Sequence, residues 1–122
     1  MSDQAPPFRW AILGTGGVAR KFVLDLRILG EQVRVVTVAS RGVENAERFA
    51  ADLGVADVAP DYATAVAADV DAVYIATPPA LHEDHALMAI AAGKAVLIEK
   101  PLALDGAAAR RIADAAQAAN VF

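Results

Sequence analysis

The chain has 122 residues, of which 57% are hydrophobic, and this length and composition suit one domain of ordinary size. Its 11 Lys and Arg residues and 15 Asp and Glu residues give a net charge of −4, and the lack of a basic run argues against nucleic acid as a partner. The absence of cysteine excludes disulfides and thiolate metal sites. Since no apolar stretch approaches the roughly 18 residues of a membrane span and no signal-peptide pattern is present, we expect a cytoplasmic protein without a membrane partner.

Apolar runs typical of buried strands alternate with amphipathic runs typical of helices, after a lead at residues 1–7 that we expect to be disordered. Strands are expected at 8–13, 33–39, 55–59, 71–76 and 95–98, and helices at 17–29, 43–53, 61–68, 80–92 and 105–119. Asp61 and Asp105 are candidate N-caps, and Val121 and Phe122 look like the start of another strand. This alternation predicts an α/β fold with a doubly wound parallel sheet, cut at the start of its sixth strand.

A glycine-rich turn, Gly14-Thr15-Gly16-Gly17-Val18-Ala19, joins the first expected strand to the first expected helix. In a dinucleotide site with this G-x-G-x-x-A pattern, Gly14 permits the tight turn, Gly16 lets a pyrophosphate approach the backbone, and Ala19 lets the helix pack closely. The N–H groups at the helix start would face the phosphates. An ordinary glycine-rich turn is the alternative, but the place of the motif in the first strand–helix unit favours a nucleotide site.

Ser40 and Arg41 end the second expected strand, about 20 residues beyond the glycine motif, where an NAD site has an Asp or Glu for the ribose 2′-hydroxyl. A hydroxyl and a guanidinium suit a 2′-phosphate instead, because arginine offers paired donors of matching geometry. The pattern therefore predicts NADP as the cofactor, with NAD less favoured. A solvated loop arginine is the alternative.

Four segments coincide with those of a known family: 9–19 at the glycine turn, 38–41 after the second strand, 75–82 (Ile-Ala-Thr-Pro-Pro-Ala-Leu-His) after the fourth, and 92–101, which ends in Glu-Lys-Pro. Together they resemble the Gfo/Idh/MocA oxidoreductases, in the branch of dimeric dihydrodiol dehydrogenases and NADP-linked sugar dehydrogenases. The resemblance implies that residues 8–122 form a Rossmann-type NAD(P)-binding domain. The family's second domain, which carries much of the substrate pocket, has no match here, so we expect no turnover by this chain alone.

The resemblance also implies roles for residues after the fourth strand. Ala76, Thr77 and Pro78 would line the nicotinamide side of the cofactor, and His82 would approach the cofactor from the next helix. His85 is expected at the surface. A metal site built from the two histidines and the intervening Glu83 and Asp84 is not expected, because their spacing does not make a convergent set.

The resemblance places the chemistry after the fifth strand. Lys100 would be the catalytic residue, since its ammonium can donate to the reacting oxygen of a substrate and take part in proton transfer. Glu99 would position Lys100 or the nicotinamide ribose, and Pro101 would fix the chain direction, so all three also count as cofactor-binding residues. A strand-end ion pair before a turn is the alternative.

We therefore predict the nucleotide-binding domain of an NADP-dependent oxidoreductase. The reaction would move a hydride between nicotinamide and a hydroxyl-bearing carbon of a sugar, polyol or trans-dihydrodiol. The expected partner is a small carbohydrate-like substrate, and a homo-oligomer is an open possibility. The alternatives are an NADP-binding module without catalysis and a truncated, inactive fragment.

Overall fold

The computed structural model describes residues 6–100 and 102–122, so the role predicted for Pro101 and most of the lead predicted at residues 1–7 lie outside the described residues. The strands are β1 (Phe8–Leu13), β2 (Val33–Ala39), β3 (Asp57–Val58), β4 (Ala72–Ile75) and β5 (Ala95–Ile98). The helices are α1 (Gly17–Leu26), α2 (Val43–Leu53), α3 (Tyr62–Ala67), α4 (His82–Ala91) and α5 (Gly106–Ala119), with 3-10 turns η1 (Arg27–Gln32) and η2 (Pro79–Leu81).

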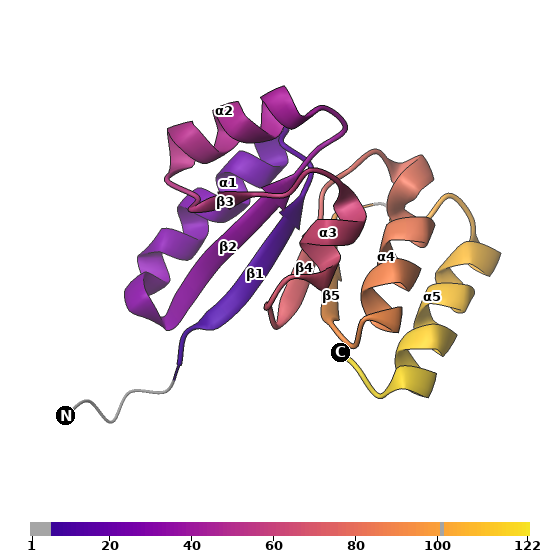
Figure 1. Ribbon diagram of the computed structural model, residues 1–122. Coiled ribbons are helices and arrows are strands. Elements are labelled where there is room, and N and C mark those ends of the chain that lie inside the picture. Colours follow the sequence, from indigo (N-terminus) through magenta and orange to yellow (C-terminus); the bar gives the residue numbers. More distant parts are fainter. Residues whose placement is uncertain (1–5, 101) are drawn as a thin grey trace.

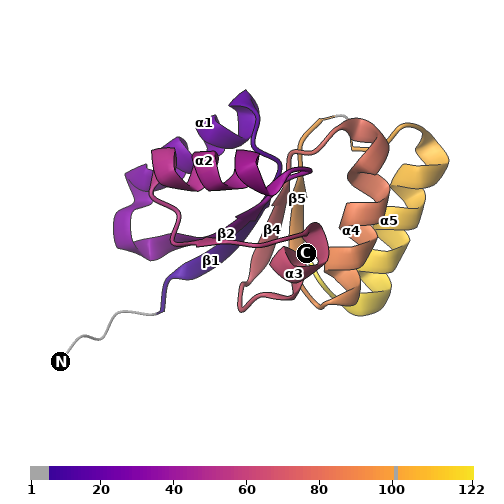
Figure 2. The same ribbon diagram turned by 45° about the horizontal axis from the view of Figure 1, so that its top comes forward.

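The strands form one parallel sheet in the order β3-β2-β1-β4-β5 (Figure 1). Helices α1 and α2 lie on one face of the sheet, and α3, α4 and α5 lie on the other, as the turned view in Figure 2 also shows. The predicted doubly wound α/β fold is therefore confirmed. The strand order reverses between β1 and β4, which is the point where such sheets bind ligands. Across the described part of the chain, no helix is long and apolar enough to cross a membrane.

Helices cover both faces of the sheet. Because successive strand residues point to opposite faces, each strand contributes side chains to both buried layers. In β1, Ile12 packs with Val38 and Phe49 beneath α1 and α2. Its neighbour Leu13 belongs to the other layer, with Ile75 and the alanines of α4. Both residues are fully buried, which explains why β1 is apolar without alternation. Alanines at the helix contacts bring the helices close to the sheet.

Both predicted N-caps are confirmed, but some predicted boundaries are wrong. The Asp61 carboxylate accepts a hydrogen bond from the Thr64 N–H at 2.7 Å, and Asp105 accepts one from Ala108 at 2.8 Å. The first helix ends at Leu26 and tightens into a 3-10 turn, because its buried face is formed by Ala19 and Val23 and does not continue to residue 29. The third strand is shorter than expected, since its ladder with β2 is limited to residues 57 and 58.

The outer edge of β5 makes one backbone contact with the last described residue. The Val96 N–H donates to the Phe122 carbonyl at 3.0 Å. Residues 121 and 122 are not assigned to a strand. A single bond of this kind is the pairing that a further parallel strand beside β5 would begin with, so the sixth strand stays a prediction.

Gly14 is the point at which three strand ends meet. Its N–H donates to the carbonyl of Ala39, the last residue of β2, at 2.9 Å, and beside it the Ala76 N–H donates to the Leu13 carbonyl at 2.8 Å. Its φ is +106°, and a β-carbon at this position would lie 2.7 Å from the Ala76 carbonyl oxygen. Only glycine meets both conditions, so the first glycine of the motif is required by the fold itself.

The Gly14→Ala variant is expected to lose about 2–5 kcal/mol of unfolding free energy, because backbone strain and overlap with the Ala76 carbonyl add together. Urea unfolding followed by circular dichroism measures this loss. Gly16→Ala is the matched control: a β-carbon there meets nothing within 4 Å, so its expected loss is about 1 kcal/mol or less. Equal losses in the two variants would contradict this account of the turn.

Candidate nucleotide-binding site

A pocket of about 400 Å³ lies at the carboxyl ends of β1, β2 and β4. Its lining residues are Gly14, Thr15, Gly16, Ser40, Arg41, Asn45, Tyr62, Ala76, Thr77 and Pro78. All of them except Asn45 and Tyr62 were predicted from the sequence as cofactor-binding residues. The fold therefore brings together four segments that are far apart in the chain, at the point where the strand order reverses.

The glycine turn supplies open backbone and helix N–H groups at one end of this pocket. Gly16 is the N-cap of α1, and its carbonyl accepts the first helical hydrogen bond from Arg20 at 3.0 Å. The N–H groups of the first helical turn have no intrahelical partner, and they carry the positive end of the helix dipole. A β-carbon at Gly16 or Gly17 would meet nothing within 4 Å. The turn therefore presents open space beside N–H groups of the kind that bind phosphate.

Ser40 and Arg41 take different roles at the opposite end of the pocket. The Ser40 hydroxyl donates to the Gly42 carbonyl at 2.9 Å and accepts from the Gly42 N–H at 3.3 Å, so it closes its own turn. Ser40 is buried, whereas Arg41 is exposed. The exposed guanidinium of Arg41 is thus the cationic group at this end of the pocket, and the serine shapes the loop that carries it.

Tyr62 and Asn45 are the pocket residues that the sequence reasoning missed. Tyr62 is the first residue of α3, directly after the N-cap, and it is half-buried. Burial raises the pKa of Tyr62, and the nearby charge of Arg41 opposes this rise. Only the cap signal of Asp61 marked this position, because α3 reaches the pocket through the tertiary fold and not through any motif.

Two histidines hold Thr77 at the end of β4. The His82 ring donates from Nε2 to the Thr77 carbonyl oxygen at 2.7 Å, and His85 Nδ1 lies 2.9 Å from the Thr77 hydroxyl. Both rings are buried, so the prediction that His85 lies at the surface is wrong. The reason is that residues 82 and 85 share the buried side of the first turn of α4, where the His85 ring packs 4.3 Å from that of Tyr62.

Neither histidine is among the lining residues of the pocket, but both contact Thr77, which lines it. Burial lowers the pKa of His85, which keeps this ring neutral near pH 7. His82 is 1% exposed and is not among the lining residues of the pocket. A direct contact between His82 and the cofactor therefore stays a prediction, and the structure shows His82 bonded to the Thr77 backbone.

Glu99 and Lys100 lie one strand further along the sheet, after β5. The Tyr74 hydroxyl donates to Glu99 Oε2 at 2.6 Å, and the Glu99 N–H pairs with the Ile75 carbonyl at 2.9 Å. Lys100 is exposed, and neither Glu99 nor Lys100 lines the pocket. The structure thus brings together the residues predicted for the phosphates, the adenosine and the nicotinamide side, and the predicted catalytic lysine lies outside their pocket.

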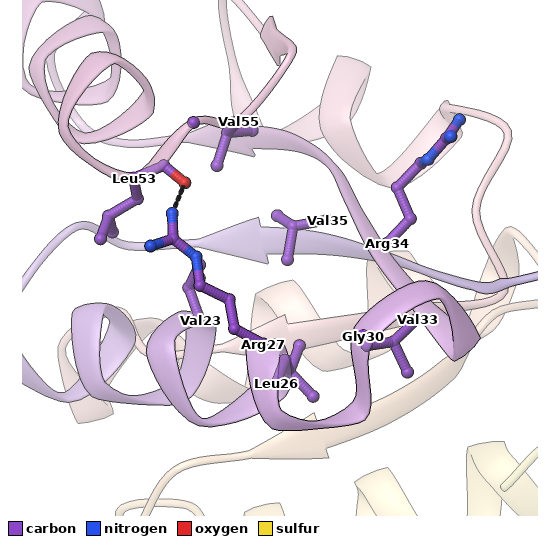
Figure 3. Close-up of a pocket in the computed structure, with 10 residues that line it drawn as sticks. Val23, Leu26, Arg27, Gly30, Val33, Arg34, Val35, Leu53 and Val55 are labelled. Carbon is purple, nitrogen blue, oxygen red and sulfur yellow. Dashed lines mark hydrogen bonds between the residues drawn. The ribbon is translucent and has the colours of Figure 1, made fainter.

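A second hollow, of about 170 Å³, lies between α1, η1, the start of β2 and the end of α2. Figure 3 shows Arg27 donating to the Leu53 carbonyl across it, while Arg34 points away. The rest of its lining is mainly valine and leucine. This hollow is far from the carboxyl ends of the strands and offers no convergent polar groups, so it is not the candidate site.

Comparison with known proteins decides the family. Residues 8–122 match the family model described as "Oxidoreductase family, NAD-binding Rossmann fold". The chain belongs to the Gfo/Idh/MocA family. The predicted NAD(P)-binding Rossmann domain is thereby confirmed, as is the relationship to the dehydrogenases of this family.

Relatives from several organisms match nearly the whole chain. It is 36% identical to trans-1,2-dihydrobenzene-1,2-diol dehydrogenase of Xenopus laevis and 37% identical to scyllo-inositol 2-dehydrogenase (NADP(+)) IolU of Bacillus subtilis. Each match covers 93% of this chain, but 35% and 34% of the respective relative. The chain thus spans about a third of the length of the curated Gfo/Idh/MocA relatives that it matches.

Solved structures give the same answer and include both cofactors. GenD2 from gentamicin A biosynthesis, in complex with NAD, superposes with a TM-score of 0.87 at 32% identity, covering 99% of this chain and 34% of that one. KijD10, a 3-ketoreductase from Actinomadura kijaniata in complex with NADP and TDP-benzene, gives 0.86 at 32% identity, covering 95% and 36%. The fold therefore serves NAD in one neighbour and NADP in another, and does not by itself choose between them.

The Tyr74–Glu99 contact makes stability depend on pH in the alkaline range. Burial first, then the hydrogen bond and charge of Glu99, raises the pKa of Tyr74 well above its ordinary value of 10.0. A raised pKa in the folded state means that the contribution is fully present below about pH 10 and is lost as the pH rises further. The free energy of unfolding of the wild type should therefore exceed that of Tyr74→Phe by a constant amount below about pH 10, and by less as the pH rises further. Urea unfolding at a series of pH values tests this, and a difference that does not change with pH would contradict it.

Proposed function

We propose that the chain binds NADP in preference to NAD and serves an oxidoreductase that acts on a hydroxyl-bearing carbon of a sugar, polyol or dihydrodiol. The observation that carries the proposal is the lining of the pocket. Open glycine backbone lies at one end and a guanidinium at the other, and none of the described residues that line the pocket is an Asp or Glu. NAD sites use such an acid for the ribose 2′-hydroxyl, and its replacement by Arg41 suits a 2′-phosphate.

The residues present fit a dinucleotide. The pyrophosphate would lie over Gly16, where no side chain or neighbouring atom fills the space, and would accept from the N–H groups at the start of α1. Arg41 would pair with the 2′-phosphate, and Asn45 and Tyr62 offer further polar groups at the same end. Thr77 and Pro78 would border the nicotinamide half.

Bound nicotinamide supplies the hydride chemistry, and the protein supplies orientation and charge. Lys100 would donate from its ammonium to the reacting oxygen of the substrate, where negative charge develops during carbonyl reduction. The names of the relatives point to substrates of one kind, a dihydrodiol in one case and an inositol in another. We extend this class to the present chain as part of the proposal.

A binding module without catalysis is the second candidate, and one observation favours it. Lys100 is exposed and does not line the pocket, so the described residues do not shield a reacting centre from water. Both candidate functions require dinucleotide binding. Calorimetric titration of the chain with NADPH and NADH in parallel tests this binding. Dehydrogenase assays with sugars, polyols and dihydrodiols then separate them. If the chain binds neither NADPH nor NADH, both candidate functions are wrong.

Arg41→Ala is expected to weaken NADPH binding by roughly 10- to 150-fold, because a charge-assisted hydrogen bond contributes about 1.5–3 kcal/mol. The Kd for NADH, which lacks the 2′-phosphate, should change little. Arg48→Ala is the matched control, since it removes the same charge from an exposed site on α2 outside the pocket. Equal losses for the two dinucleotides would refute the assignment of Arg41.

Gly16→Val is expected to abolish binding of both dinucleotides, because its methyl groups would occupy the space over the helix start. Gly106→Val places the same side chain in open space at the start of α5, away from the pocket, and should bind NADPH as the wild type does. Calorimetry gives the affinities, and circular dichroism checks that both variants fold. Tight NADPH binding by Gly16→Val would show that the phosphates lie elsewhere.

A further inference from the structure

A row of packed aromatic side chains crosses the sheet beneath α1 and ends at Tyr74. The rings of Trp10 and Phe22 meet edge to face at 5.1 Å, and those of Phe22 and Tyr74 stack at 3.9 Å with an interplanar angle of 9°. These three residues come from β1, α1 and β4. Tyr74 is 3% exposed, so its ring is held by packing from several sides. The direction of its hydroxyl is therefore set by the core.

This fixed hydroxyl holds the carboxylate next to the proposed catalytic lysine. It donates to Glu99 Oε2 at 2.6 Å, across 25 residues of sequence. The backbone of Glu99 is fixed as well, by its N–H bond to the Ile75 carbonyl. Glu99 is half-buried and directly precedes Lys100, which is exposed. The chain thus anchors one residue of the Glu-Lys pair to its core at two points.

A phenol is well suited to this task. A carboxylate has about four acceptor positions, and a single hydroxyl uses one of them. Lysine or arginine in the same place would orient Glu99 but would also neutralise its charge. The Tyr74 phenol is protonated and is a donor near neutral pH, as phenols ordinarily are, and its raised pKa extends this range further into alkali. The result is an oriented carboxylate that still accepts from other donors.

We propose that Tyr74 is a positioning residue for the reacting end of the site. It holds Glu99 so that the remaining acceptor positions of the carboxylate receive a hydroxyl of the nicotinamide-bearing half of the dinucleotide. This inference rests on the proposed function, because it requires that NADP(H) bind along the carboxyl edge of the sheet. The adenosine half, at Arg41, lies outside its reach.

Tyr74→Phe tests the proposal, because it keeps the ring stacked on Phe22 and removes only the hydroxyl. Calorimetry with two ligands separates local from general effects: NADPH contains both halves of the dinucleotide, whereas 2′,5′-ADP contains only the phosphorylated adenosine half. We expect the variant to bind NADPH about three- to tenfold more weakly, because the lost hydrogen bond acts on the ligand only through Glu99. It should bind 2′,5′-ADP as tightly as the wild type does. Equal weakening of both ligands would mean a purely structural role and would overturn the proposal, as would unchanged NADPH binding.

The Glu99→Ala variant provides a check that does not depend on the folding of Tyr74→Phe. It should show the same ligand pattern, and ultraviolet titration should find the Tyr74 phenol ionising at lower pH than in the wild type. Adding Tyr74→Phe to Glu99→Ala should then cause no further loss of NADPH affinity, because the two residues act as one unit. Additive losses would overturn the inference. If the wild type binds neither ligand, the proposed function fails instead, so the two failures are distinguishable.

Discussion

The contact between Gly14 and the end of β4 is the constraint on which the site depends. The Gly14 backbone bonds to Ala39 at the end of β2 and lies so close to the Ala76 carbonyl that no side chain fits between them. Three strands therefore end within a few ångströms of one another, and the loops that follow them must share one small volume. The pocket at the reversal of the strand order is a consequence of this junction.

Buried side chains then set the orientation of each loop at this edge. Thr77 is held through its carbonyl by His82 and through its hydroxyl by His85, and Glu99 is held by Tyr74. In each case a buried polar group is satisfied by a residue close to the ligand edge, so core packing and site geometry are coupled. Groups that are positioned in this way lose little entropy on binding, which favours ligand affinity.

The sequence predicted the parts of the site that depend on local chain geometry. The glycine turn and Ser40-Arg41 each follow a strand, and parallel strands deliver such residues to one edge. Tyr62 and the burial of His85 could not be predicted, because they result from the packing of α3 against α4. Ser40 lines the pocket, and its hydroxyl also forms hydrogen bonds with Gly42 within its own turn, a local contact that residue type alone did not reveal. Its contact with a phosphate stays a prediction.

The two ends of the proposed site differ in how far the chain completes them. At the proposed adenosine end, residues from the loops after β1 and β2 and from α2 and α3 line the pocket. At the reacting end, Lys100 is exposed, and so are the nearby Leu97 and Leu102. Hydride transfer requires a donor and an acceptor carbon held in contact and shielded from water. A cofactor alone cannot provide that shield, so catalysis would require further protein surface over Lys100, whereas recognition of the dinucleotide would not. The proposal therefore makes dinucleotide binding and turnover separately testable.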